Sequence, residues 1–236
     1  MVECLVPVAS NVAVVRDRIS AAARRAGRKP EDITLMAVTK TQPPEIICEA
    51  YQAGIRLFGE NRVQEFAGKS EALRDLLEAD WHLIGHLQTN KAARAAELFS
   101  AVDSVDSLRL AQKLNASAEE QKRKLPVLIE INIGGEAAKS GVAPASAELH
   151  ELLDAAPTLT HLAIRGLMTV PPFTEDPEHA RPFFRKLREL RDQVAAQKHP
   201  AVGMDTLSMG MSHDLEVAIE EGSTCVRVGT AIFGKR

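Results

Sequence analysis

Eight short apolar runs occur along the chain, and between them apolar residues recur every three or four positions. Each run is too short for a buried helix and most are rich in β-branched residues, which predicts buried strands. The stretches between the runs have the spacing of amphipathic helices. The predicted strands are residues 33–38, 55–58, 81–84, 99–102, 127–133, 162–168, 206–209 and 225–228.

The alternation of strands and helices indicates the fold class. Continuous βα units imply a parallel sheet with right-handed crossovers, and eight units match the number that closes a barrel. We therefore predict an α/β protein in which residues 1–236 form a single (β/α)8 TIM-barrel domain. An open doubly wound sheet is the main alternative, but its glycine-rich first turn is replaced here by the polar segment that contains Lys40.

A further helix is predicted before the first strand. Apolar residues recur every three or four positions from Val12 to Ala26, with Ser10 before them and Gly27 after them. This pattern predicts a capped amphipathic helix. Because no full helix follows the last strand, we expect the N-terminal helix to cover the gap between the last strand and the first.

Composition and charge exclude several classes of protein. The net charge of −3 and the short basic runs give little support for nucleic-acid binding. No apolar run is long enough to cross a bilayer, and Glu3 lies where a signal peptide would be basic. The three cysteines, Cys4, Cys48 and Cys225, contain no CxxC pair, so a disulfide framework is not expected. We expect a cytoplasmic protein that binds neither nucleic acid nor membrane.

Lys40 is the first candidate for chemistry, because it follows the first predicted strand directly. In a βα barrel the active site is built from residues at the carboxyl ends of the strands. Desolvation at an apolar mouth favours a neutral lysine amine, which can attack a carbonyl group to form a Schiff base. The alternative is a lysine whose ammonium extends to solvent.

The last two βα units predict a phosphate site. Ser208 and Gly210 follow the seventh predicted strand, and Gly229 and Thr230 follow the eighth. Loops after strands 7 and 8 commonly bind phosphate in these barrels through backbone N–H groups, and hydroxyl groups can add donors. The alternative is that the glycines only make tight turns.

Arg227 is expected to face the barrel interior together with Cys225, while the valines beside them face outward. A buried arginine needs a partner, and either a ligand or Glu130 could supply it. A lysine for an imine, a phosphate cradle and a buried arginine together suggest pyridoxal 5′-phosphate (PLP). Arginine only donates hydrogen bonds, so a ring nitrogen that contacts it would stay unprotonated and the ring would be a weak electron sink.

The histidine pair His82 and His86 could suggest a metal site. Their i, i+4 spacing falls on a predicted strand, where the two side chains would lie about 13 Å apart along the chain. That separation is too large for two ligands of one metal, so we predict no metal site and ordinary hydrogen-bonded histidines.

Seven segments together closely resemble the pyridoxal phosphate homeostasis proteins, a family of small PLP-binding proteins. The resemblance spans residues 35–234 and is far more specific than any single turn. It implies a barrel like the N-terminal domain of alanine racemase, of fold type III among PLP proteins. The segments are LMAVTKTQP, FGENRVQE, WHLIGHLQTNK, VDSVDS, INIGGEAAKSGV, IRGLMTVPP and LSMGMSHDLEVAIEEGSTCVRVGTAIFG.

The resemblance also implies roles for individual residues. Lys40 would carry PLP as a Schiff base, and Arg227 would contact the ring nitrogen. Ser208, Gly229 and Thr230 would contact the phosphate. The walls of the pocket would be Asn61, His86, Met168 and Met209.

The function implied is to hold PLP and deliver it, which keeps the intracellular pools of PLP and vitamin B6 in balance. No catalytic residue or reaction is assigned, and the expected partners are PLP and the PLP-dependent apo-enzymes that receive it. The resemblance and the predicted lack of a dimerising domain both lead us to expect a monomer.

Two enzyme functions are the alternatives. A PLP-dependent amino-acid racemase needs a second acid/base opposite the lysine, usually a tyrosine from a partner subunit, and a second β domain. Tyr51 is the only tyrosine of this chain, and it is predicted on the apolar stripe of a helix outside the barrel. A barrel enzyme acting on phosphosugars without PLP would instead use Lys40 to bind phosphate.

Overall fold

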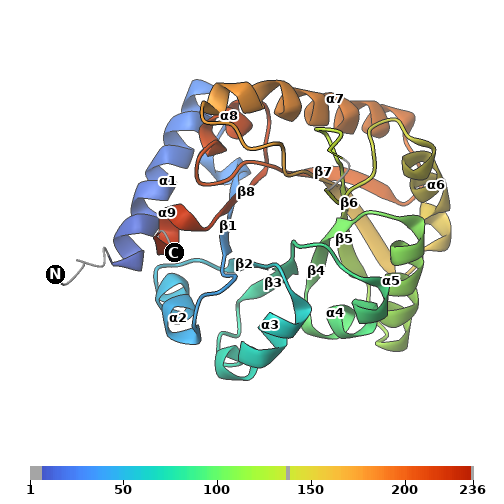
Figure 1. The fold of residues 1–236 in the computed structure, drawn as a ribbon, viewed down its shortest axis with the longest axis horizontal. Coiled ribbons are helices and arrows are strands. Elements are labelled where there is room, and N and C mark those ends of the chain that lie inside the picture. The colour runs from blue at the N-terminus through green and yellow to red at the C-terminus, as the bar shows by residue number, and fades with distance from the viewer. Residues whose placement is uncertain (1–6, 137–138, 235–236) are drawn as a thin grey trace.

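A computed structural model describes residues 7–136 and 139–234 of the chain. The described residues form a closed barrel of eight parallel strands in the order β1 to β8, with helices around the outside (Figure 1). The TIM barrel predicted from the sequence is therefore confirmed, and the open sheet is excluded. The strands are β1 Thr34–Val38, β2 Leu57–Glu60, β3 Asp80–Leu83, β4 Ala101–Val105, β5 Leu125–Glu130, β6 Leu162–Met168, β7 Val202–Ser208 and β8 Cys225–Val228.

The helices follow the strands along the chain, except for α1, which precedes β1, and their apolar faces pack on the outside of the barrel. Among the described residues, no helix is long and apolar enough to cross a membrane. The helices are α1 Val8–Arg25, α2 Pro44–Gln52, α3 Val63–Lys69, α4 Ala92–Leu98, α5 Leu108–Glu120, α6 Ala147–Ala155, α7 Arg181–Gln197, α8 Leu215–Glu220 and α9 Thr230–Phe233.

Helix α1 covers the gap between the last strand and the first, as predicted. It packs against α2, α8 and α9. The Asn11 amide donates a hydrogen bond to the Ile232 carbonyl oxygen (2.8 Å), and the Arg18 guanidinium pairs with the Glu216 carboxylate (2.6 Å). The predicted cap is wrong, because α1 begins at Val8 and its N-cap residue is Pro7, so Ser10 lies inside the first turn.

Three strands include charged or glycine residues that lay outside the strands predicted from the sequence. Strand β2 ends at Glu60 and β4 includes Asp103, because each carboxylate has a cationic or histidine partner that offsets its burial. Strand β7 begins at Val202 rather than at residue 206. Its second residue, Gly203, lets β6 and β7 approach closely, because an added Cβ would lie 3.1 Å from the Ile164 carbonyl oxygen.

Strand β5 is shorter than predicted. It ends at Glu130 rather than at residue 133, and Ile131 makes only an isolated bridge to Val142. Asn132 therefore lies beyond the strand, in the loop that leads to α6. Its side chain organises this loop, since its amide donates to the Glu136 carbonyl oxygen (2.9 Å) and its oxygen accepts from the Glu136 N–H (3.2 Å).

Candidate functional site

The strand register brings the predicted lysine and its neighbours together at the carboxyl end of the barrel. Val38 pairs with Gly59, so Lys40 and Asn61 each lie two residues beyond a paired position on neighbouring strands. Gly229 lies against β1 as well, because a Cβ added to it would be 3.5 Å from the Val38 carbonyl oxygen. Lys40, Asn61 and Gly229 therefore come from three adjacent strand ends.

Arg227 lies inside the barrel and is almost fully buried. Its guanidinium donates to the Ser208 hydroxyl oxygen (2.7 Å) and to the Thr169 carbonyl oxygen (2.7 Å). Burial lowers the pKa of Arg227 from its usual value, while nearby negative charges such as Asp103 and Glu130 oppose this shift. The two hydrogen bonds fix the plane of a cation at the centre of the barrel.

Glu130 is another buried charged residue at this end of the barrel. Its Oε1 atom accepts a hydrogen bond from the Ser140 hydroxyl group (3.0 Å), and its Oε2 atom is buried with no hydrogen-bond partner among the described residues. Burial raises the pKa of the Glu130 carboxyl group. The ion pair between Arg227 and Glu130 that the spacing left open is therefore replaced by separate hydrogen bonds to Ser208, Thr169 and Ser140.

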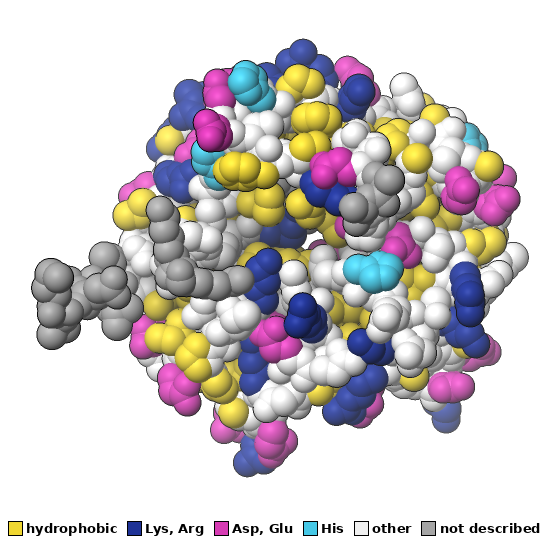
Figure 2. Space-filling model, viewed as in Figure 1, with side chains coloured by type: hydrophobic (Ala, Val, Ile, Leu, Met, Phe, Trp, Pro, Cys, Tyr) yellow, Lys and Arg dark blue, Asp and Glu magenta, His cyan; other side chains and the backbone are white. Residues whose placement is uncertain are grey.

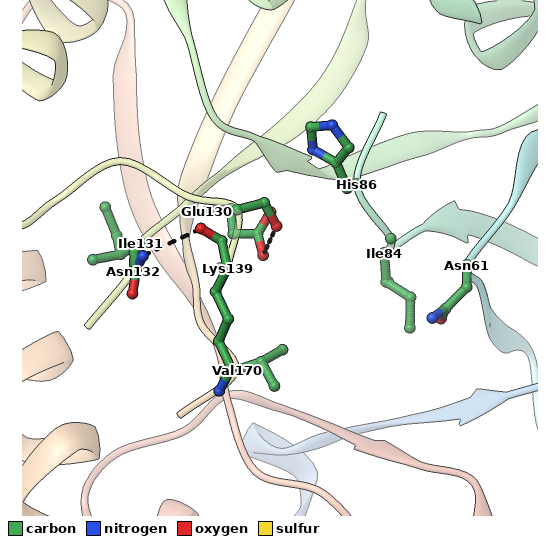
Figure 3. Close-up of a pocket in the computed structure, with 10 residues that line it drawn as sticks. Asn61, Ile84, His86, Glu130, Ile131, Asn132, Lys139 and Val170 are labelled. Atoms are coloured by element: carbon green, nitrogen blue, oxygen red, sulfur yellow. Dashed lines mark hydrogen bonds between the residues drawn. The ribbon is translucent and has the colours of Figure 1, made fainter. Parts of the chain in front are cut away.

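A cavity of about 570 Å³ opens at this end of the barrel. Figure 3 shows Asn61 and His86 on one side of it, with Glu130 and Asn132 on the other. The face drawn in Figure 2 is hollowed near its centre. His86 is exposed, and its ring bonds to the Asp106 carboxylate through Nδ1 (3.0 Å). The cavity brings together two of the predicted pocket walls.

The loops after β7 and β8 lie against each other, which places the predicted phosphate residues side by side. The Arg227 N–H donates to the Gly210 carbonyl oxygen (2.9 Å), and the Ala231 N–H donates to the Ser212 hydroxyl oxygen (3.1 Å). Gly210 has φ +93, and an added Cβ would lie 2.5 Å from the Ala218 Cβ. Helix α9 begins at Thr230, and the N–H groups of Ile232 and Phe233 both donate to the Gly229 carbonyl oxygen (2.9 Å).

The remaining predicted residues lie at different places in the fold. Met168 is fully buried on β6 and pairs in register with Ser208, while Met209 is fully buried within the core cluster. Their roles as pocket walls stay predictions. Tyr51 packs on the core from α2, outside the barrel as predicted, and the Arg56 guanidinium lies 4.0 Å from its ring centre.

The opposite end of the barrel interior contains a smaller cavity of about 190 Å³. The His82 ring there bonds to the Asp103 carboxylate through Nδ1 (3.1 Å), which makes both predicted histidines hydrogen-bonded residues. Burial lowers the pKa of His82, but the Asp103 charge and hydrogen bond outweigh it and raise the pKa overall. Burial also raises the pKa of the Cys225 thiol to about 12.

The sequence analysis missed the groups that hold the Lys40 turn. Glu60 and Lys69 form a buried ion pair with Oε1 and Nζ 2.7 Å apart, and both contact Thr39. The available signal was the charged residue Glu60, two positions after the apolar pair Leu57 and Phe58. Thr169 was also missed, because it contacts Arg227 through its backbone carbonyl, which any residue type provides.

Comparison with known proteins identifies the family. Residues 11–236 match the family of the alanine racemase N-terminal domain. The pyridoxal phosphate homeostasis protein of Aquifex aeolicus strain VF5 is 48% identical over 222 residues, which cover 94% of this chain and 95% of that protein. The chain belongs to the family of pyridoxal phosphate homeostasis proteins.

A second curated relative and a solved structure support the assignment. The pyridoxal phosphate homeostasis protein of Escherichia coli strain K12 is 47% identical over 231 residues, which cover 97% of each chain. The structure of PipY from Synechococcus elongatus PCC7942, with PLP bound, has a TM-score of 0.84 and 36% sequence identity. The match covers 96% of this chain and 100% of PipY. The resemblance seen in the sequence motifs is therefore confirmed.

Proposed function

We propose that this protein binds PLP through a Schiff base on Lys40 and acts in the homeostasis of intracellular PLP and vitamin B6. The observation that carries the proposal is the buried Arg227 guanidinium, held by Ser208 and Thr169 at the mouth of a barrel whose first strand leads into Lys40. Family membership and the solved PipY structure with PLP bound support the same cofactor.

The donor groups at the mouth fit the chemistry of PLP. Arg227 is a fixed cation that can donate to the pyridine nitrogen, and Lys40 supplies an amine for an aldehyde. Ser208, Gly229 and Thr230 lie on adjoining strand ends, where hydroxyl and backbone N–H groups suit a phosphate. Asn61, His86, Met168 and Met209 are proposed as the walls around the ring.

We assign this protein a holding role rather than catalytic turnover. When bound, PLP supplies an electrophilic aldehyde and an electron-withdrawing ring. A ring nitrogen that accepts a hydrogen bond from Arg227 stays unprotonated, because arginine has no proton acceptor and does not give up its proton. Arg227 would therefore leave bound PLP a weak electron sink that supports carbanion chemistry poorly, while Lys40 would hold it through its amine.

The cellular setting is also part of the proposal. We propose a cytoplasmic monomer whose partners are PLP and the PLP-dependent apo-enzymes that receive it. The net charge of −3 supports a protein that does not bind nucleic acid.

The visible absorbance of the purified protein, measured with and without added PLP, tests the proposed function. We expect a Schiff-base band in the wild type and none in Lys40→Ala. Lys91→Ala is a matched control, because Lys91 lies close to Asn61 and His86 on a surface pocket beside the mouth. A wild type that takes up no PLP, or a Lys40→Ala variant that keeps the band, would contradict the proposal.

A proton-exchange assay on a panel of L- and D-amino acids separates a carrier from a racemase. We expect the loaded wild type to exchange the α-protons no faster than free PLP does. Exchange well above that rate would overturn the holding role and favour the racemase.

A further inference from the structure

The turn that carries Lys40 is bound by a largely buried ionic cluster, which we call the Glu60 cluster. Its members are Thr39, Glu60, Glu65 and Lys69. The cluster lies between the carboxyl ends of β1 and β2 and helix α3. It is separate from the donor groups of Arg227 and Ser208 on the other side of the mouth.

Lys69 is the centre of the cluster. Its Nζ atom lies 2.7 Å from the Glu60 Oε1 atom and 3.4 Å from the Glu65 Oε1 atom. The same ammonium donates to the carbonyl oxygens of Thr39 (2.9 Å) and Gln42 (3.4 Å). Its side chain is 9% exposed and that of Glu60 is 0% exposed, so these contacts are shielded from water and salt.

The two carboxylates hold the turn at other atoms. The Thr39 hydroxyl group donates to the Glu60 Oε1 atom, and the Thr41 backbone N–H donates to the Glu65 Oε1 atom. Thr41 has a φ of +65, a conformation that is costly for a β-branched residue and persists only where the surroundings fix it. Backbone groups on both sides of Lys40 are therefore bound to the cluster.

A cluster of this kind is a poor source of stability by itself. Burying an ion pair costs about as much as the pair returns, and apolar residues of similar size often serve stability equally well. Glu60 illustrates the cost, since burial raises the pKa of its carboxyl group and its Oε2 atom has no hydrogen-bond partner in residues 7–136 and 139–234. What the ionic cluster supplies, and an apolar one would not, is a set of directional bonds to the Lys40 turn.

We propose that Glu60 and Lys69 are positioning residues, which act through the Thr39–Gln42 turn to hold the Lys40 amine where it can retain PLP. This inference rests on the proposed Schiff base at Lys40 and assigns its geometry to residues outside the cofactor pocket.

The test compares PLP with 4-deoxypyridoxine 5′-phosphate, an analogue that lacks the aldehyde and cannot react with a lysine. In Lys69→Met we expect the affinity for PLP to fall about tenfold or more, because a reacting group displaced by about 1 Å loses a large part of its advantage. The affinity for the analogue should stay within about twofold of the wild type, since its binding does not use the Lys40 amine. The PLP affinity of Glu60→Gln should lie between those of the wild type and Lys69→Met, because this variant keeps the hydrogen bonds and loses the charge.

One control variant and one pair of variants separate positioning from simple destabilisation. Arg123→Met removes a cation that holds the carbonyl oxygens of Ala96 and Ser100, far from the Lys40 turn, and should leave both affinities unchanged. Thr39→Val removes the hydroxyl group at similar size and should weaken PLP binding, whereas Thr39→Ser keeps the hydroxyl group and should restore it.

The outcomes distinguish this inference from the proposed function. Equal losses of PLP and analogue affinity in Lys69→Met would make the cluster purely structural and overturn the inference, as would unchanged PLP affinity. Borohydride reduction of the loaded wild type followed by peptide mapping should find PLP on Lys40 and not on Lys69. Failure of the wild type to bind PLP would instead overturn the proposed function.

Discussion

The two ends of the barrel interior are built by the same eight strands but differ in how their polar groups are paired. At the carboxyl end, the cavity of about 570 Å³ contains Glu130 with an unpartnered buried oxygen. At the amino end, the cavity of about 190 Å³ contains Asp103, both of whose carboxylate oxygens lie within hydrogen-bond distance of the His82 ring. An unpaired buried polar group costs stability, so it is expected where a ligand can complete the pairing.

The difference agrees with the general division of labour in this fold. In βα barrels the carboxyl ends of the strands carry the site and the amino ends contribute stability. The two ends should therefore respond differently to mutation. Changes at the carboxyl end, which is the mouth of the barrel, should alter cofactor binding more than stability. Changes at the amino end, which we call the floor, should do the reverse.

The largest expected effect is at the mouth, in Arg227→Met. Removing one partner of a buried charged hydrogen bond costs about 2–5 kcal/mol, which corresponds to a fall in PLP affinity of about 30-fold or more. Stability should change by only about 1 kcal/mol, because an apolar side chain replaces a desolvated cation. PLP titration and urea unfolding of the same variant measure the two quantities.

Arg165→Met is the matched control at the floor. Arg165 lines the smaller cavity, but its side chain is 55% exposed and pairs with Asp205 at the surface, so the change should alter neither quantity. If Arg227→Met bound PLP with wild-type affinity but had a much lower free energy of unfolding, the proposed contrast between the two ends would be contradicted.

The second expected effect is at the floor, in Asp103→Asn. The pKa of His82 is raised in the folded protein, so the folded state binds the proton more tightly than the unfolded chain does. The stability that Asp103 adds is therefore fully present below the ordinary histidine value, about 6.5, and is lost as the pH rises through the raised value. We expect the free energy of unfolding of the variant to be lower than that of the wild type by about 1–3 kcal/mol below pH 6.5, and by less at higher pH.

Unfolding of wild type and Asp103→Asn across pH 5.5–9 measures this difference, with PLP affinity as the second readout. The affinity should stay within about twofold of the wild type. A stability loss that grew with rising pH would have the wrong sign and would refute the role assigned to the His82 pair.

The sequence predicted the barrel and some residues of the mouth, because these depend on local patterns. Apolar runs of strand length and the alternation with helices do not need tertiary information, and residues directly after a strand reach the mouth by geometry. Lys40, Asn61, Arg227 and Gly229 could therefore be named from the chain alone. Their contacts with PLP remain predictions.

The Glu60 cluster could not be predicted in the same way. A carboxylate normally marks the end of a buried run, and β2 was accordingly placed two residues too early. Only the fold shows that Lys69, nine residues later on α3, reaches Glu60 and makes its burial tolerable. Pairings of this kind depend on how a helix lies on its strand, and the spacing of apolar residues does not specify that.

The smallest expected effect is in Glu130→Gln, which tests whether the unpartnered oxygen at the mouth costs stability. Burial raises the pKa of Glu130, so in the folded protein its ionised form is disfavoured relative to the unfolded chain. Wild-type stability is therefore lost as the pH rises through the raised value, whereas a glutamine does not ionise.

We expect the free energy of unfolding of Glu130→Gln to equal that of the wild type near pH 4 and to exceed it by up to about 1 kcal/mol at pH 8, as measured by urea unfolding. Ser140→Ala is the paired control, because it removes the one hydrogen bond that the Glu130 side chain accepts within the described residues. The free energy of unfolding of this variant should fall more between pH 4 and pH 8 than that of the wild type does. A Glu130→Gln variant less stable than the wild type at pH 8 would show that the mouth is paired as completely as the floor, and the contrast between the two ends would then rest on Arg227 alone.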